Sequence, residues 1–332
     1  MTFYSHTLVL LACVTLAGCA TPGSAPQTAV LPPQTQYDAV LTDHRGTRLS
    51  INQLAGELAA ADVVVIGEYH GHHGAHLLQS LLQSALYQQR PQQVLTMEQF
   101  TLDDQGELDR YLAGDTGESE LIADTEAWPN YKASYRPLVE FARNHGLPVL
   151  AANAPAHTVR CVGRQGVDYL QQLTATERRR LPGDAFIDTP AYREKFFATM
   201  ASGHGGADIS TRMKNTYRAQ LLRDNTMAAQ VIRALDAYPG HQVIHVTGTF
   251  HAEERLGMVA VLETRRPDLN VAVISPVFWQ NGDSLGELTR TDGSKGDFLY
   301  YLQPLPDEYK DQERHREAMM QQFRNAAKVR CD

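Results

Sequence analysis

The stretch from Val63 to His76, VVVIGEYHGHHGAH, decides how the rest of the chain is interpreted. Its first four residues are apolar, which is typical of a strand buried on both faces of a parallel sheet. Gly67 then marks a turn. The nine positions after it hold six polar or titratable side chains: Glu68, Tyr69, His70, His72, His73 and His76. Because ligands bind at the carboxyl ends of strands in open α/β sheets, this stretch predicts a strand that delivers reactive groups to a cleft.

Length and charge narrow the class of protein. The chain has 332 residues, which allows one large domain or one and a half, and at 43% hydrophobic it can form a sizeable core. Its formal net charge is -8, whereas a nucleic-acid-binding protein normally carries a basic face. We therefore expect no nucleic-acid partner.

The N-terminus has the pattern of a processing signal. Residues 8–16 are apolar but too few to span a membrane, and they run into Leu16-Ala17-Gly18-Cys19. This resembles a bacterial lipoprotein signal peptide, residues 1–18, cleaved before a Cys19 that then carries palmitate-type acyl chains. An ordinary secretory signal is the alternative. Ala20 at the following position favours sorting to the outer membrane, by resemblance to lipoprotein sorting rules, with the periplasmic and surface sides both open.

Two further segments outside the core have distinct compositions. Residues 19–36 carry no charge and are rich in Pro, Ala, Thr and Gln, so they predict a flexible tether.

Cys161 and Cys331 are the cysteines left after processing and lipidation. In an oxidising compartment such a pair predicts a disulfide, with two buried free thiols as the alternative.

The remaining sequence alternates strand and helix patterns. Further short apolar runs predict strands at 93–97, 147–152, 242–246 and 270–274, with an edge strand at 297–302 and a hairpin turning at 43–46. Residues 167–225 have no strand pattern and predict an inserted, smaller all-helical subdomain. The expected fold is α/β over 37–306, with a mainly parallel β-sheet flanked by helices, followed by a C-terminal helix and tail at 307–332.

Polar groups of similar kind follow three of the predicted strands: Glu68 with His70, then Glu98, then His251. If the sheet is parallel, they share its carboxyl edge, and the set suits metal ligation, acid-base chemistry or both. A single histidine after a strand is more often a hydrogen-bonded structural residue.

The other histidines are spaced for a helix face. His72 and His76 are four residues apart, as in metal-binding helices, but a solvated helix start explains them equally well. His72 and His73 are the expected surface pair.

Several common catalytic and cofactor motifs are absent from the sequence. It contains no phosphate-binding P-loop and no Gly-x-Gly-x-x-Gly after the first strand. Tyrosine is the remaining signal: Tyr131 and Tyr135 are four residues apart, beside Trp128 and Lys132. A tyrosine phenolate can bind ferric haem iron, although aromatic residues at helical spacing are commonly core.

Taken together, five short motifs resemble the ChaN-like haem-binding lipoproteins, within the wider superfamily of Tiki, TraB and erythromycin-esterase-like proteins. The resemblance covers about Leu54 to Pro276. The motifs are Gly67-Glu68-Tyr69-His70, Met97-Glu98-Gln99-Phe100, Ala151-Ala152-Asn153-Ala154-Pro155, Asp224-Asn225-Thr226-Met227-Ala228 and Gly248-Thr249-Phe250-His251.

The resemblance implies a haem-binding protein of the outer membrane that works in iron acquisition. The characterised ChaN type binds a cofacial pair of haems between two subunits. A tyrosine of one subunit ligates the iron, and a histidine and a lysine of the other reach the propionates. Here it would imply Tyr131 or Tyr135 as the ligand with Tyr69 in reserve, Lys132 and His73 at the propionates, a homodimer when loaded, and a haem-uptake receptor as partner.

The same resemblance leaves a second hypothesis open. In Tiki-like relatives the corresponding positions, here Glu68, His70, Glu98 and His251, carry metal-dependent peptide hydrolysis. The esterase-like relatives use a histidine-centred hydrolysis. A hydrolase, with a divalent metal or with a histidine alone, is therefore the alternative to a haem-binding protein.

Overall fold

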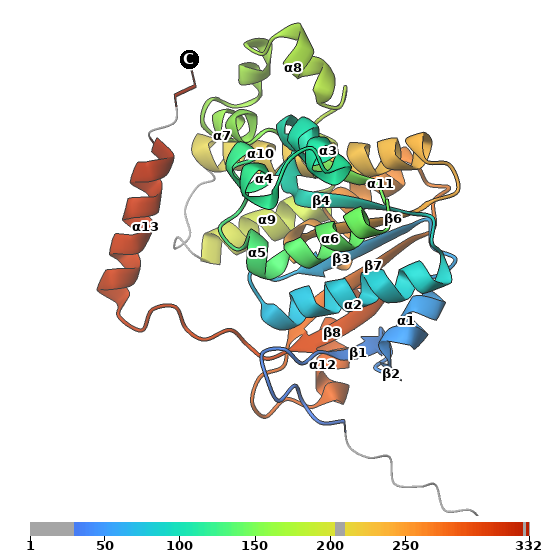
Figure 1. Cartoon of the computed structure of the whole chain (residues 1–332). Coiled ribbons are helices and arrows are strands. Elements are labelled where there is room, and N and C mark those ends of the chain that lie inside the picture. The colour runs from blue at the N-terminus through green and yellow to red at the C-terminus, as the bar shows by residue number, and fades with distance from the viewer. Residues whose placement is uncertain (1–29, 203–209, 328–329, 332) are drawn as a thin grey trace, which may run out of the picture. The chain divides into compact units, whose positions relative to one another are not determined.

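A sheet with the strand order β2-β1-β8-β7-β3-β6-β4-β5 lies at the centre of the computed structural model, which describes residues 30–202, 210–327 and 330–331 (Figure 1). All neighbours from β8 to β5 are parallel, and β1 is antiparallel to both β2 and β8. The predicted α/β class with a mainly parallel sheet is confirmed. The strands are β1 Val40–Asp43, β2 Arg48–Leu49, β3 Val63–Glu68, β4 Gln93–Thr101, β5 Val149–Asn153, β6 Gln242–Gly248, β7 Val271–Phe278 and β8 Phe298–Leu302.

Helices connect most of the strands. None of them, in the described part of the chain, is long and apolar enough to cross a membrane. The α-helices are α1 Ile51–Glu57, α2 His73–Gln89, α3 Gln105–Ala113, α4 Glu118–Asp124, α5 Tyr131–Ser134, α6 Arg136–Asn144, α7 Ala156–Gln165, α8 Ala175–Arg180, α9 Pro190–Ser202, α10 Thr211–Ala237, α11 Met258–Arg265, α12 Leu285–Asp292 and α13 Gln312–Ala327. Short 3₁₀ turns include η1 Leu102–Asp104, η2 Val167–Gln171, η3 Thr249–His251 and η4 Glu253–Arg255.

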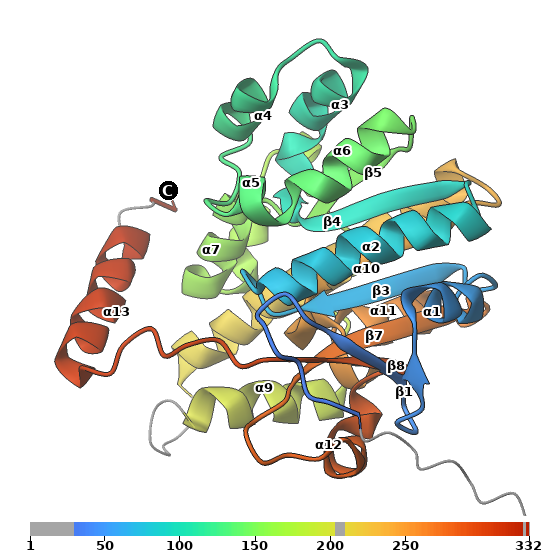
Figure 2. The same cartoon turned by 60° about the horizontal axis from the view of Figure 1, so that its bottom comes forward.

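Strand β3 is buried on both faces, which explains its unbroken apolar run. Val64 and Ile66 belong to the core cluster under α1, α2 and α6. Val63 and Val65 belong to the opposite cluster, with α10 and α11. Figure 2 shows α2 over one face of the sheet and α10 and α11 behind it. Because successive side chains of a strand point to opposite faces, both sets must be apolar.

The strand expected at the sheet edge is not at the edge. Strand β8 lies between β7 and β1, and the N-terminal hairpin supplies the two outer strands. The hairpin turn is held by the Asp43 carboxylate, which accepts hydrogen bonds from the backbone N–H groups of Arg45 and Thr47. The edge prediction was wrong because β1 pairs with β8, a partner more than 250 residues away that local patterns do not reveal.

The segment expected to be helical contains η2, α8, α9 and the start of α10, with no strand in its described part. Helix α10 then continues to Ala237 and packs on the sheet. Its first turn is capped by the Ser210 hydroxyl, which accepts from the Met213 N–H at 3.2 Å. The sequence also offers Asp208 as a cap of this helix, and this residue lies outside the described ones.

The predicted disulfide is confirmed. Cys161 of α7 is bonded to Cys331, with a Cα–Cα distance of 5.5 Å. The His157 ring Nε2 also contacts the Arg330 carbonyl at 2.8 Å, so the residues before Cys331 are fixed to α7. Cys19, the predicted signal peptide and most of the predicted tether lie outside the described residues.

Candidate functional site

The structure brings the predicted strand-end residues together. Glu68 ends β3, Glu98 lies in β4, and His251 closes the short turn η3 after β6. Strand β6 lies between the other two, with Glu68 in register with Gly248. Because the three strands are parallel, their carboxyl ends meet at one edge of the sheet, as the sequence predicted.

Glu68 is the centre of the first group of contacts. Its Oε1 accepts hydrogen bonds from the His70 Nδ1–H at 2.8 Å and from the Tyr135 hydroxyl at 2.7 Å. The side-chain amides of Gln79 and Gln99 donate to the same carboxylate, at 2.5 and 3.3 Å. Burial opposes ionisation, but His70 and the other donors outweigh it and hold the pKa of Glu68 below its usual range. A buried carboxylate with this many donors stays ionised.

Glu98 and His251 form the second group, together with Asp224 of α10. Glu98 Oε2 accepts from the Gly248 N–H and from the Thr247 hydroxyl, each at 2.7 Å. Glu98 Oε1 lies 3.4 Å from Nε2 of His251. On the other side of the ring, Nδ1 of His251 lies 2.7 Å from Oδ1 of Asp224. The imidazole is therefore held between two buried carboxylates.

This placement fixes the charge of the second group. Burial lowers the pKa of His251, but Glu98 and Asp224 together raise it to about 10. Glu98, although buried, has its pKa well below the usual range because it faces His251. Complete burial raises the pKa of Asp224. At neutral pH the ring is an imidazolium.

Gly248 lies between the two groups. A Cβ at this position would stand 2.8 Å from Nε2 of His70 and 3.6 Å from Oε2 of Glu98. Only a residue without a side chain leaves His70 its place. His70 is exposed, and its hydrogen bond to Glu68 raises its pKa against the effect of burial. The site therefore combines one accessible imidazole with a buried, charged pair, an arrangement suited to proton transfer.

The four residues predicted as metal ligands are divided between the two groups of contacts: Glu68 and His70 lie in the first, and Glu98 and His251 lie in the second. Among the described residues, no group of three or more His, Cys, Asp or Glu side chains is arranged to hold a metal ion. Asp224 was not predicted as a site residue. The one signal for it in the sequence was its place in the motif Asp224-Asn225-Thr226-Met227-Ala228.

The tyrosines predicted as iron ligands are packed into the protein. Tyr135 is 0% exposed and donates to Glu68, and Tyr131 is buried with no partner for its hydroxyl among the described residues. Tyr69 stacks on Phe278 with ring centroids 4.1 Å apart. Burial raises the pKa of Tyr69 to about 12. Iron ligation requires an accessible phenolate, which neither Tyr131 nor Tyr135 presents here, whereas Tyr69 is partly exposed and its hydroxyl donates to the Pro276 carbonyl at 3.3 Å.

The histidines after the motif are divided between interior and surface. His72 was expected on the surface, but it is buried as the N-cap of α2, because its Nδ1 accepts from the Gly74 N–H and its Nε2 contacts the Gln303 carbonyl. His76 is buried as well, and its Nδ1 lies 3.0 Å from the Gln79 amide oxygen. Neither ring is placed for a metal.

Both residues predicted at the haem propionates are at the surface. His73, the first residue of α2, is exposed, and its ring stacks on that of Tyr37 with centroids 5.3 Å apart. Lys132 of α5 is exposed as well. Both remain available to an external ligand.

A solved structure with a similar fold supports this architecture. The chain matches ChaN of Campylobacter jejuni, a structure that shows cofacial heme binding, at 16% identity, 82% coverage of this chain, 100% of that chain and a TM-score of 0.60. An erythromycin esterase mutant, EreC, in its open conformation matches at 15% identity, 84% and 86% coverage and a TM-score of 0.44. RETICULATA-RELATED 5 of Arabidopsis thaliana, a chloroplastic protein, is 23% identical over 230 residues, 64% of this chain and 29% of its own length.

The chain thus spans less than a third of that plant protein. The family model that matches is described as haem-binding uptake, Tiki superfamily, ChaN, and it covers residues 54–262. This is more than half of the chain and includes both groups of the site. The protein belongs to the ChaN family of the Tiki superfamily.

Proposed function

We propose that the protein binds haem and takes part in haem or iron acquisition, held at the outer membrane by a lipid on Cys19. The observation that carries the proposal is the match to the haem-binding uptake family over residues 54–262. The lipoprotein pattern at Leu16-Ala17-Gly18-Cys19 supports the anchor. A homodimer in the loaded state and handover to an uptake receptor belong to the same proposal.

The surface supports a different iron ligand from the tyrosines chosen by sequence. In the described part of the chain, the exposed tyrosines are Tyr37, at 60%, and Tyr309, at 40%. Each ring is stacked on a histidine, Tyr37 on His73 and Tyr309 on His315. Phenolate and imidazole are both haem-iron ligands. Because these two tyrosines are exposed, a porphyrin can reach either pair, whereas it cannot reach the buried Tyr131.

We favour Tyr37 with His73 because of the surface beside them. Leu77 and Leu81 follow His73 at intervals of four along α2, and both are exposed. Residues four apart share a helix face, so these side chains form an apolar strip next to the ligand pair. An exposed apolar strip suits the flat macrocycle, and Lys132 is an exposed cation for a propionate.

Titration of the purified protein with haem, followed by the Soret band, tests the proposal. The wild type should shift the band. Tyr37→Phe should abolish the shift, while Tyr309→Phe, the matched exposed tyrosine, should retain it. If haem added to the wild type shows no shift of the Soret band, the haem proposal is wrong. If only Tyr135→Phe loses the shift, the iron ligand is the buried Tyr135 and not Tyr37. Sedimentation with and without haem tests the dimer.

A hydrolase is the second candidate, favoured by the placement of His251 between Glu98 and Asp224 beside the exposed His70. In such a group His70, hydrogen-bonded to Glu68 through Nδ1, could accept a proton from water that attacks an ester or peptide carbonyl. The His251 imidazolium could stabilise the negative charge that develops there. Ester and peptide hydrolysis should be lost in His251→Ala and retained in His145→Ala, an exposed control. Metal analysis of protein purified without added metal separates a metal-dependent reaction from a histidine-based one.

A further inference from the structure

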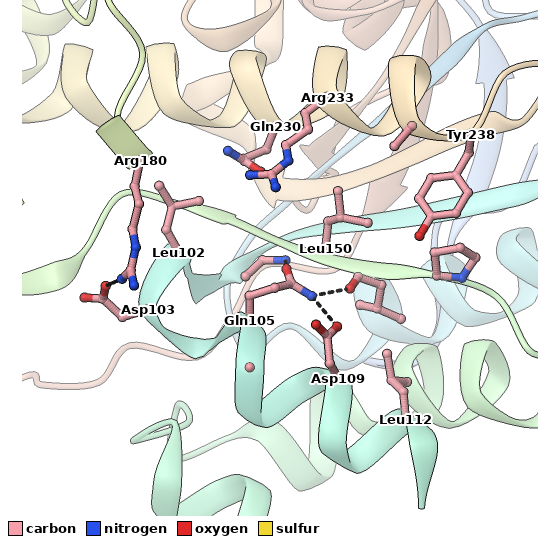
Figure 3. A pocket seen from close by; sticks show the side chains of 15 residues that line it. Leu102, Asp103, Gln105, Asp109, Leu112, Leu150, Arg180, Gln230, Arg233 and Tyr238 are labelled. Carbon is pink, nitrogen blue, oxygen red and sulfur yellow. Dashed lines mark hydrogen bonds and ion pairs between the residues drawn. The ribbon is translucent and has the colours of Figure 1, made fainter. Parts of the chain in front are cut away.

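A cavity of about 650 Å³ lies along the edge strand β5, and it shares no lining residue with the strand-end site (Figure 3). Its walls are α3 on one side and the C-terminal half of α10 on the other, and its volume is within the range typical of ligand pockets, about 300–1,000 Å³. Nothing in the proposed haem function uses this cavity.

The backbone of β5 is not free to pair with an added strand. The side-chain amide of Gln105 donates to the Val149 carbonyl at 3.0 Å and accepts from the Ala151 N–H at 2.7 Å. Figure 3 shows Gln105 lying against β5 in this way. Since Gln105 already occupies the Val149 carbonyl and the Ala151 N–H at the middle of the edge, strand addition is not the use of the cavity.

The α10 wall presents hydrogen-bonding groups that lack protein partners. The Gln230 side chain is 7% exposed, and its amide has no hydrogen-bond partner among the described residues. Arg233, one turn further along α10, has no ion-pair or hydrogen-bond partner there either. Both side chains point into the cavity in Figure 3. Solvent in the cavity reaches both groups, so a ligand carboxylate can exchange their bound water for charge-assisted hydrogen bonds.

The opposite wall carries a negative charge. Oδ1 of Asp109, on α3, accepts from the Gln105 side chain at 2.7 Å, and no Lys or Arg in the described ranges forms an ion pair with this carboxylate. The other charges of the cavity neutralise each other, because Arg180 pairs with Asp103 at 2.7 Å. The walls therefore offer one cation and one anion that face each other across apolar side chains, those of Leu112 and Leu150.

We propose that this cavity binds the zwitterion of an amino acid or short peptide with an apolar side chain. The ligand carboxylate binds Arg233 and Gln230, the ammonium group binds Asp109, and the apolar side chain contacts Leu112 and Leu150. A guanidinium is the preferred partner of a carboxylate because it can donate two parallel hydrogen bonds. Haem fits less well, because its two propionates leave the Asp109 carboxylate without a cation.

Calorimetric titration of the full chain with leucine and with L-leucyl-L-leucine tests the proposal. At least one of them should bind. N-acetylation removes the cation and amidation of the carboxylate removes the anion, and each should weaken binding by about tenfold or more. Arg233→Gln should have the same effect as amidation, and Arg212→Gln, an exposed arginine of the same helix outside the cavity, should have none.

Asp109→Asn separates ligand recognition from a structural effect. This variant should bind the acetylated and the free ligand equally, with unchanged unfolding temperature. No binding of either probe at millimolar concentration would overturn the proposal, as would equal binding of free and acetylated ligand to the wild type. Displacement of the dipeptide by haem, with no effect of Asp109→Asn, would assign the cavity to haem instead.

Discussion

Replacing Glu98 by glutamine is the sharpest test of the charge assigned to His251. The carboxylate of Glu98 receives three donors: the Gly248 N–H, the Thr247 hydroxyl and the Nε2–H of His251. A glutamine has nearly the same shape but one acceptor oxygen. Whichever way its amide lies, an NH₂ group faces a donor, so one donor is left unmatched at a cost of about 1–3 kcal/mol.

The loss of charge adds to this cost. The folded-state pKa of His251 is about 10 against an ordinary value of 6.5, so its stabilisation is fully present below pH 6.5 and lost as pH rises through 10. A displacement of this size corresponds to about 5 kcal/mol at most. About 2 kcal/mol of it should disappear between pH 6.5 and pH 8 in the wild type. In Glu98→Gln the remaining carboxylate partner of His251 is Asp224, so the pKa of His251 should fall. The free energy of unfolding should then change less between pH 6.5 and pH 8 than in the wild type.

Two measurements check this reasoning. Urea unfolding at several pH values should show the free energy of unfolding falling as pH rises in the wild type, and falling less in the variant. NMR titration of the His251 ring should give its pKa directly. Glu57→Gln, at an exposed position of α1, is the control and should change neither. An unchanged ring pKa in Glu98→Gln, or a wild type whose stability is constant from pH 6.5 to 9, would refute the assignment.

Three further changes have expected outcomes. Gly257→Ala places a Cβ 2.5 Å from the His251 carbonyl oxygen at a φ of 57°, so thermal unfolding should show a loss of about 2–5 kcal/mol; an unchanged melting temperature would contradict the clash. Tyr135→Phe removes one donor from Glu68 and should cost about 1.5–3 kcal/mol in urea, whereas Tyr87→Phe, at the surface, should cost little. Cys161→Ser opens a bridge between residues 170 apart, which loop entropy makes worth about 5 kcal/mol at most, and limited proteolysis should then release the C-terminal segment.

The sequence predicted what depends on local pattern and on general rules for sheets. The apolar run at Val63–Ile66 identified a doubly buried strand, and the rule for parallel sheets placed Glu68, Glu98 and His251 at a common edge. The prediction worked because strand ends carry residues to fixed places regardless of the loops between them. A general rule also predicted the disulfide between Cys161 and Cys331, because an even pair of cysteines in an oxidising compartment is usually bonded.

What the sequence did not reveal depends on long-range packing. His72 looked like a surface residue because its buried position requires the carbonyl of Gln303, 231 residues later. Asp224 lies on a long helix, and spacing alone does not tell which of its polar residues meets His251. Tyr131 and Tyr135 were correctly placed on one segment, but the side of α5 that faces the core is set by its contacts with α2.

The two edges of the sheet determine how this protein can associate with itself. At one edge β2 has two residues, too few to template another chain, and at the other the Gln105 amide occupies the groups of β5. Polymerisation by edge-to-edge pairing is therefore disfavoured at both ends, by the shortness and the Arg48 charge of β2 and by the Gln105 amide at β5. Gln105→Ala would free the β5 edge alone, so light scattering should show pairs joined through β5 and no open-ended polymer, because β2 stays too short to accept a strand.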